Sequence, residues 1–183
     1  MNSVAFSTFT QNILMQVLLS SSQLTASIDA LAAQLNKNHP DHDDVIFVGI
    51  QQGGVVLANS ITASLQKLAP AGKVQYGQLD ITFYRDDIRN EILAPDTMNL
   101  PFAIENKTVV LIDDVLFTGR TIKAALDVLL DYGRPAKVEL CVLIDRKEHR
   151  QFPIQADYVG KTVTTAKTDK VKLVNNEVVL ISA

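Results

Sequence analysis

Two adjacent acids and a threonine–glycine turn stand next to each other within residues 109–121. Four apolar residues predict a buried strand there, and Asp113 and Asp114 follow at its carboxyl end. In an open parallel sheet that edge is where ligands bind. The turn at 115–121 leads into a helix, so its N–H groups and hydroxyls could bind an anion. Together these groups predict a site for a sugar 5-phosphate, with the carboxylates accepting hydrogen bonds from the ribose hydroxyls.

Two other interpretations stay open on these residues alone. Asp113 and Asp114 could hold a magnesium ion directly, or they could be solvated acids before an ordinary turn. No serine or cysteine nucleophile motif suggests a covalent mechanism. The single cysteine, Cys141, excludes an intrachain disulfide and a cysteine-based metal site, and its apolar neighbours predict that it is buried.

Helices and strands alternate on both sides of this segment. Ser20 and Gln23 form a capping-box pattern before an amphipathic helix that fades at 36–40. The polar stretch 85–106 has no clear periodicity and is typical of a functional loop or lid. Further strands are predicted at 45–48, 74–84, 109–113, 138–144, 171–174 and 178–181, and further helices at 53–68 and 121–131. This alternation indicates an α/β fold with a parallel sheet flanked by helices.

Length and charge limit the class of protein. With 183 residues, the chain suits a single domain at 1–183, with a core at about 40–160 and a small hood subdomain from its N-terminal and C-terminal segments. The net charge of −3 argues against a protein that mainly coats nucleic acid. The apolar patch at 13–19 is too short to span a membrane, so we expect no membrane partner and a cytoplasmic location.

The segment 109–121 resembles the signature of the type I phosphoribosyltransferases. Residues 79–87, 133–136, 142–146 and 154–161 are similar to one branch of that family, the PyrR-type pyrimidine regulators with uracil phosphoribosyltransferase activity. The resemblance extends from about residue 45 to residue 170. It implies the phosphoribosyltransferase type I fold.

The resemblance also implies a role for particular residues. Asp113 and Asp114 would hold the ribose hydroxyls, and Arg85, in the loop that begins at 84–87 and closes over the reacting centre, would be a further catalytic residue. The 5-phosphate would lie on the rest of the signature: Val115, Leu116, Phe117, Thr118, Gly119, Arg120 and Thr121. The pyrophosphate loop would be Gln51, Gln52, Gly53 and Gly54. The base pocket would contain Asp145, Arg146, Val159 and Lys161.

The implied reaction is the transfer of the phosphoribosyl group from phosphoribosyl pyrophosphate (PRPP) to a nucleobase, with uracil giving UMP and pyrophosphate. Magnesium would be bound mainly through PRPP and not directly by the protein. A homo-oligomer, a dimer or higher, is expected. Two alternatives are an RNA-binding regulator that senses UMP or PRPP and a purine transferase of the hypoxanthine type. Phe117 stands where the latter would carry an acid, which favours a pyrimidine.

Two departures from the branch pattern bear on function. The usual Thr-Arg-Gly of the pyrophosphate loop is replaced by Gln52-Gly53-Gly54, so an arginine contact is lost. Residues 1–45 contain no arginine and only Lys37 as a cation, which makes RNA binding doubtful. Basic side chains later in the chain are expected to form a solvated surface, with His149 a surface residue: Arg146, Lys147, His149, Arg150, Lys161, Lys167, Lys170 and Lys172.

Overall fold

A parallel sheet forms the centre of the molecule. The computed structural model describes residues 14–81 and 99–182. In this part of the chain five strands pair in the order β3-β2-β4-β5-β6, and every neighbouring pair is parallel. The strands are β3 (Gln75–Leu79), β2 (Val45–Ile50), β4 (Thr108–Leu116), β5 (Lys137–Asp145) and β6 (Tyr158–Thr162). Their carboxyl ends therefore meet at one edge, as the α/β prediction requires.

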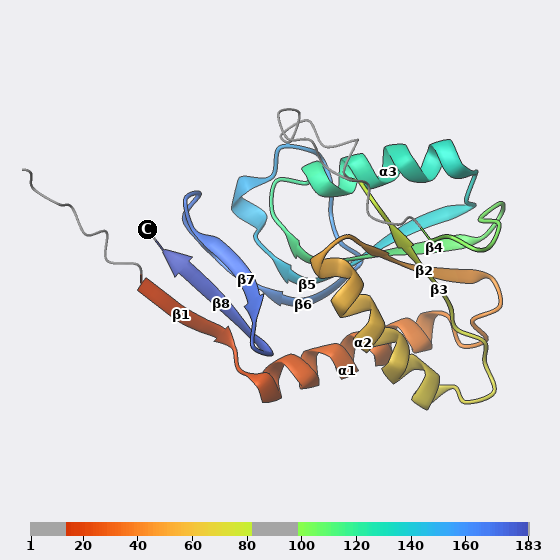
Figure 1. Ribbon diagram of the computed structural model, residues 1–183, viewed down its shortest axis with the longest axis horizontal. Helices are drawn as coiled ribbons and strands as arrows, with labels where there is room; N and C mark the ends of the chain where they lie inside the picture. The colour runs from red at the N-terminus through yellow and green to blue at the C-terminus, as the bar shows by residue number, and fades with distance from the viewer. Residues whose placement is uncertain (1–13, 82–98, 183) are drawn as a thin grey trace, which may run out of the picture.

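Helices cover both faces of this sheet (Figure 1). The helices α1 (Ser21–Asn38) and α2 (Gly53–Leu68) pack on one face, and α3 (Arg120–Tyr132) packs on the other. Side chains alternate between faces along each strand. Accordingly Phe47 and Val110 belong to the core beneath α1 and α2, whereas Val48 and Leu111 belong to the core beneath α3.

The first helix begins as its capping pattern predicts. The backbone N–H of Gln23 donates to Ser20 Oγ at 3.5 Å, and the backbone N–H of Ser20 donates to Gln23 Oε1 at 3.0 Å. Two otherwise unsatisfied donors are thus paired. Leu31 and Leu35 on its inner side are fully buried against the sheet.

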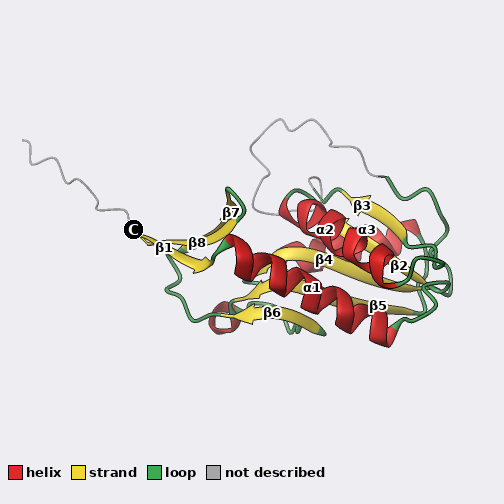
Figure 2. Ribbon diagram, turned by 90° about the horizontal axis from the view of Figure 1, so that it is seen from below, coloured by secondary structure: helices red, strands yellow, loops and turns green. Residues whose placement is uncertain are grey.

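A second sheet lies at one end of the molecule (Figure 2). Three antiparallel strands, β1 (Leu14–Leu19), β8 (Glu177–Ser182) and β7 (Lys170–Val174), pair in that order and form the hood. The two C-terminal strands were predicted, but β1 was not. This sheet combines an N-terminal and two C-terminal segments of the chain, whereas α1 packs along the main sheet with its buried leucines in the central core.

Two further elements differ from the predictions. The strand predicted at 74–84 ends at Leu79 in the structure, and residues 82–98 lie outside the described residues. The described end of the polar stretch is fixed by Asn99, which exchanges two backbone hydrogen bonds with Gln78, and by the fully buried Ile104. Residues 147–149 form a short 3-10 turn, η2 (Lys147–His149).

In the described ranges no helix combines the length and the apolar character that crossing a membrane requires.

Candidate functional site

The two acids point to opposite sides of the sheet. The strand β4 continues past them to Leu116, with Asp113 opposite Val142 and Val115 opposite Ile144 in regular register. Asp113 is 5% exposed and its Oδ1 accepts a hydrogen bond from the backbone N–H of Asp114 at 3.0 Å. Because neighbouring residues of a strand face opposite ways, each carboxylate lines a different cavity.

Asp113 lines a cavity of about 240 Å³ beside the start of α3. The structure brings together around it every residue predicted to hold the 5-phosphate: Val115, Leu116, Phe117, Thr118, Gly119, Arg120 and Thr121. Gly119 has a φ of +89°, a left-handed conformation that favours glycine, and it caps a helix with no acid in its first turn. The positive end of the α3 dipole therefore faces a cavity that suits an anion.

Asp114 lies against the start of α2. A Cβ on Gly53 would lie 2.1 Å from Asp114 Oδ2, and one on Gly54 would lie 2.3 Å from the carbonyl oxygen of Ile112. The peptide bond between Gln51 and Gln52 is cis. The side chain of Asp114 therefore occupies the space beside residue 53, the position at which the branch pattern has an arginine. Burial raises the pKa of Asp114, against the opposing effect of its hydrogen bonds with Asp113 and the backbone.

The second cavity, of about 220 Å³, lies between α1, α2 and the hood. Asp114 shares its lining with hydroxyl and amide side chains and with apolar ones: Ser21, Thr25, Ser60, Asn176, Leu24, Ile28, Val56, Leu57, Leu143 and Leu173. Asp113 and Asp114 therefore line two different cavities at the carboxyl edge of the sheet.

The charged residues predicted for the base pocket already have partners in the structure. Asp145 is 2% exposed and forms an ion pair with Arg150, and Lys161 Nζ donates to the carbonyl oxygen of Leu18 at 2.8 Å. Arg146 lies with its guanidinium carbon 3.8 Å from the centre of the Phe117 ring. Val159 packs against the core beneath α3. Asp145 and Arg146 thus lie beside the phosphate loop, whereas Lys161 contacts β1.

Two predictions about the basic cluster were wrong. Arg146 is 3% exposed and donates to Thr165 Oγ1 at 2.7 Å and to the carbonyl oxygen of Ala166 at 2.9 Å. His149 is half-buried, with Nε2 2.9 Å from the carbonyl oxygen of Thr165 and its ring edge-on to Phe117. Charge alone suggested a solvated surface, and nothing in the local sequence indicated these distant partners. The expected catalytic residue Arg85 lies outside the described residues.

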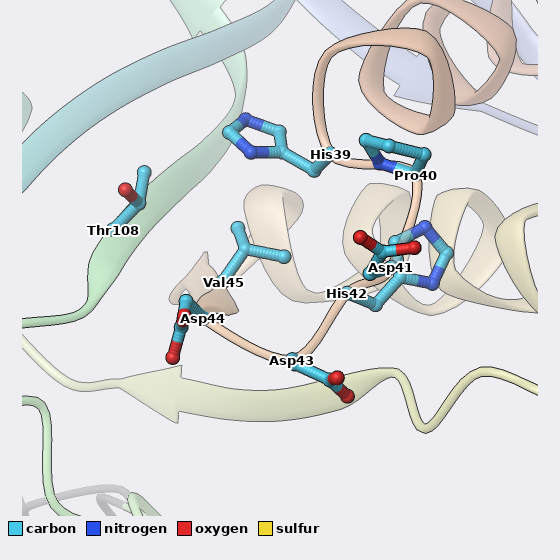
Figure 3. Close-up of a pocket in the computed structure, with 8 residues that line it drawn as sticks. All are labelled: His39, Pro40, Asp41, His42, Asp43, Asp44, Val45 and Thr108. Atoms are coloured by element: carbon cyan, nitrogen blue, oxygen red, sulfur yellow. The ribbon is translucent and has the colours of Figure 1, made fainter.

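A polar cavity of about 260 Å³ opens at the opposite edge of the sheet (Figure 3). Its lining residues come from the end of α1, the loop before β2 and the start of β4: His39, Pro40, Asp41, His42, Asp43, Asp44, Val45 and Thr108. Among the described residues no group of three or more His, Cys, Asp or Glu side chains is placed to hold a metal ion. Ligands of parallel sheets bind at the carboxyl edge, so this cavity is not part of the candidate site.

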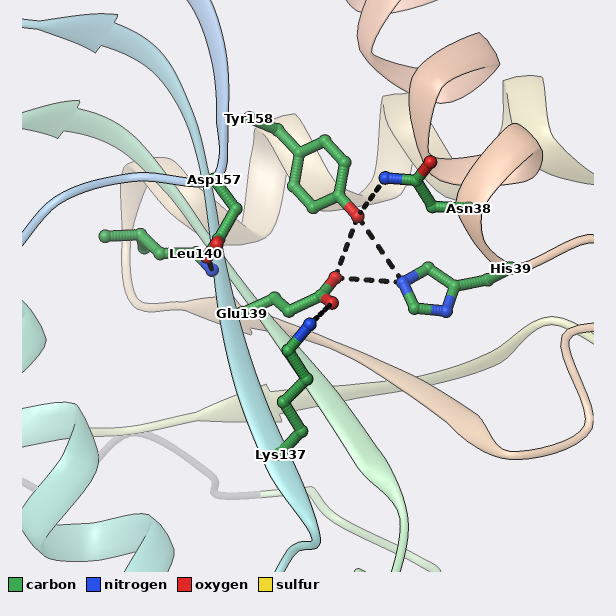
Figure 4. A network of polar contacts seen from close by, with 7 residues as sticks. All are labelled: Asn38, His39, Lys137, Glu139, Leu140, Asp157 and Tyr158. Atoms are coloured by element: carbon green, nitrogen blue, oxygen red, sulfur yellow. Dashed lines mark hydrogen bonds and ion pairs between the residues drawn. The ribbon is translucent and has the colours of Figure 1, made fainter.

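A network of polar side chains ties α1 to the sheet near that cavity (Figure 4). The buried carboxylate of Glu139 accepts from Tyr158 at 2.8 Å and from Lys137 at 2.7 Å, and lies 2.9 Å from His39 Nε2. Burial raises the pKa of Glu139, but these hydrogen bonds outweigh it and the pKa is lowered. Burial first, and then the Glu139 carboxylate, raise the pKa of Tyr158 to about 12.

Comparison with known proteins agrees with this geometry. The model of the phosphoribosyl transferase domain family matches residues 18–177. The Bifunctional protein PyrR of Geobacter sulfurreducens is 43% identical over 157 residues, covering 85% of this chain and 88% of that protein. That of Ligilactobacillus salivarius is 51% identical over 140 residues, covering 74% and 78%.

Solved structures support the same fold. A hypoxanthine phosphoribosyltransferase from Staphylococcus aureus superposes with a TM-score of 0.65 at 25% identity, covering 88% of this chain and 85% of that chain. One from Trypanosoma cruzi reaches 0.67 at 17% identity over 82% of both chains. The chain therefore belongs to the phosphoribosyl transferase domain family and has the type I fold. Its relatives place it in the PyrR-type branch, as the sequence resemblance predicted.

Proposed function

We propose that the chain transfers the phosphoribosyl group of PRPP to uracil, giving UMP and pyrophosphate. The observation that carries this proposal is the 240 Å³ cavity, in which the buried Asp113 and the start of α3 share one lining. A sugar 5-phosphate has both an anion for the helix start and hydroxyls for the carboxylate. Binding both ends of the sugar fixes its C1 atom relative to the pyrophosphate loop.

The reaction displaces pyrophosphate from C1 by a ring nitrogen of the base, through a transition state with oxocarbenium character. Backbone N–H groups at the start of α2 would face the departing pyrophosphate, because the two glycines there carry no side chain. The carboxylate of Asp113 would hold the ribose hydroxyls in the phosphate cavity, and that of Asp114, beside the start of α2, would lie near the developing positive charge. No protein nucleophile takes part.

Magnesium fits this donor set. The acid pair offers hard carboxylate oxygens at the site, and magnesium is commonly bound by one or two carboxylates together with substrate phosphates and water. Most of its ligands would come from PRPP, and Asp113 and Asp114 are the protein carboxylates that would help to hold it. When bound, the ion would neutralise charge on the leaving pyrophosphate.

The choice of uracil rests on the branch and on Phe117. The relatives are PyrR proteins, and Phe117 lines the phosphate cavity where a transferase of the hypoxanthine type would carry an acid. An apolar ring cannot donate a hydrogen bond to a purine ring nitrogen or accept one from it.

We also expect a dimer or higher oligomer, which light scattering on the purified chain measures directly.

The deciding experiment offers the purified chain PRPP, magnesium and one of five bases: uracil, hypoxanthine, guanine, xanthine or orotate. Pyrophosphate release is expected with uracil. Replacing both acids, Asp113→Asn with Asp114→Asn, should lower the rate by at least about a hundredfold through loss of charge stabilisation. Asp44→Asn is the matched control, because this exposed aspartate lies at the opposite edge of the sheet. Turnover of a purine instead of uracil, or of no base, would contradict the proposal.

A further inference from the structure

The phosphate loop is held from outside the cavity by one short segment, residues 150–154. The carbonyl oxygen of Thr118 accepts from the backbone N–H groups of Gln151 at 2.9 Å and Phe152 at 3.3 Å. The carbonyl oxygen of Phe117 accepts from Arg150 Nη1. Two successive carbonyl groups of the loop are therefore satisfied by groups that do not line the cavity.

Arg150 connects this loop to the central sheet. One arm of its guanidinium group donates to Phe117, and Nη2 donates to Asp145 Oδ1 at the carboxyl end of β5. The side chains are 17% and 2% exposed, so the ion pair is largely shielded from water. A buried charge is retained in folded proteins when it is paired and hydrogen-bonded. Asp145 therefore fixes the position of Arg150, and Arg150 fixes the Phe117 carbonyl.

The segment also supports the turn from two other directions. Arg120 Nε donates to Gln151 Oε1 at 2.9 Å. A Cβ placed on Gly119 would lie 3.2 Å from Ile154 Cδ1, so the left-handed turn packs directly on that side chain. The segment thus touches the loop at Phe117, Thr118, Gly119 and Arg120 in succession.

These contacts matter for an anion because peptide groups carry opposite partial charges at their two ends. A carbonyl oxygen turned into the cavity would repel a phosphate, whereas one held outside leaves the N–H groups of the turn to face inward. We propose that Arg150 is a positioning residue for the 5-phosphate: it holds the Phe117 carbonyl out of the cavity and keeps the loop ready for the ligand. This inference rests on the proposed function, since it takes the ligand to be a phosphoribosyl group.

The assignment changes the role inferred for Asp145. The sequence resemblance implies a base-pocket residue, but its carboxylate is engaged by Arg150. In this arrangement Asp145 acts through Arg150 on the phosphate end of the substrate. Arg150→Lys is informative because a lysine can keep the charge but cannot bridge a carboxylate and a carbonyl with a planar fork.

The test measures ribose 5-phosphate binding by calorimetry and the KM and kcat for PRPP with uracil, in Arg150→Met, Arg150→Lys and Asp145→Asn. Arg150→Met is expected to weaken ribose 5-phosphate binding and to raise the KM for PRPP by about tenfold or more, as for loss of a hydrogen bond to a charged group. Its kcat at saturating PRPP should stay within about threefold of the wild-type value. The hydrogen bond from Arg150 to Phe117 should affect phosphate binding equally in the substrate complex and in the transition state. Arg150→Lys should fall between wild type and Arg150→Met.

The control is Lys147→Met, which removes an exposed cation from the adjacent 3-10 turn. It should leave the ribose 5-phosphate affinity, the KM for PRPP and the kcat unchanged. Unchanged ribose 5-phosphate affinity in Arg150→Met, or a fall in kcat alone that matches a loss of folded protein, overturns the inference while the proposed function stands. If Arg150→Met does not fold, the same comparison on Arg150→Lys and Asp145→Asn decides. Wild-type protein that binds neither ribose 5-phosphate nor PRPP overturns both.

Discussion

Gly53 and Gly54 lie against β4 in different ways, and their substitutions should separate activity from stability. A Cβ on Gly54 would meet the backbone oxygen of Ile112 at 2.3 Å, whereas the three atoms nearest to one on Gly53 all belong to the carboxylate of Asp114. Backbone cannot move without disturbing the sheet, but a side chain can turn. Gly54→Ala should therefore lower the free energy of unfolding by about 1–3 kcal/mol, the usual effect of overpacking.

Gly53→Ala should instead displace Asp114, with a smaller loss of stability and a clear loss of transferase activity. Chemical denaturation and uracil transferase assays on the two variants measure both effects. Gly53→Arg, which restores the arginine of the branch pattern, should not improve activity, because any side chain at residue 53 needs the space of the Asp114 carboxylate. A higher pyrophosphate affinity in Gly53→Arg would show that the Asp114 carboxylate does not prevent a side chain at residue 53 from binding pyrophosphate.

His42 should make stability depend on pH. The residue is 1% exposed, neither ring nitrogen has a hydrogen-bond partner among the described residues, and its φ of 54° is left-handed. Burial, aided by His39, lowers the pKa of His42 from its ordinary value of 6.5, although Asp41 and Asp43 oppose the shift. As pH falls below that value the unfolded chain takes up the proton first, so stability present at neutral pH is lost towards acid pH.

His42→Asn tests this dependence, because asparagine does not titrate and tolerates a positive φ. The difference in unfolding free energy between variant and wild type, measured from pH 8 to pH 5, should shift in favour of the variant once the pH drops below about 6.5. Parallel curves over the whole range would exclude His42 as a source of acid sensitivity.

At the level of elements, the end of α1 is held to the sheet by the Glu139 network (Figure 4). Tyr158 donates to Glu139 and accepts from Asn38 Nδ2 at 2.9 Å, so it links the helix to β5 and β6. Tyr158→Phe keeps the ring and removes the hydroxyl. A hydrogen bond to a charged group contributes about 1.5–3 kcal/mol, and thermal or chemical denaturation should show a loss of that order.

Because the network lies away from the candidate site, transferase activity per folded molecule should stay at the wild-type level in Tyr158→Phe. Tyr132→Phe is a useful comparison, since Tyr132 also donates its hydroxyl, at 2.5 Å, but to the neutral backbone carbonyl of Leu100. A smaller loss is expected there. Equal losses of stability in the two variants would mean that the charge of Glu139 does not strengthen its hydrogen bond with Tyr158.

Elements with local signals could be predicted from the sequence. The capping box indicated the start of α1, and the apolar run and turn indicated β4 and α3 in order. The strand β1 could not be predicted, because its partner β8 is at the other end of the chain and its side chains are mostly exposed. The strand β6 was assigned only to a base pocket, since five residues with two polar ones carry little periodicity.

The same distinction applies to the candidate site. The residues around the phosphate cavity are contiguous in sequence, so one segment was enough to predict them. The role of Arg150 depends on partners thirty-three and five residues away, at Phe117 and Asp145, and a single charged residue in a polar turn does not reveal them. The separation of Asp113 from Asp114 also needed the structure, because it depends on β4 continuing past both acids.

For the whole molecule, the distribution of charge argues against tight RNA binding. Net charge is −3, and the exposed cations of the C-terminal half are Arg134 and lysines such as Lys147 and Lys167. Arg146 and Arg150 are turned inward, to Thr165 and to Asp145. Since phosphate contacts supply most of the affinity, structured RNA should bind with a Kd of about 10⁻⁴–10⁻⁶ M at physiological salt, as for nonspecific contacts.

Filter binding with a structured hairpin RNA and a scrambled RNA of equal length measures this, and the two should bind alike. Adding cations to the exposed side of α1 with Asp29→Arg and Ala33→Arg should tighten both and steepen the salt dependence by about one unit for each further phosphate that an arginine neutralises. The paired variants Asp29→Gln and Ala33→Gln control for loss of the hydrogen bond from Ser64 to Asp29. Tight wild-type binding that prefers the hairpin and weakens steeply with salt would instead assign the chain an RNA-regulatory role beside its transferase fold.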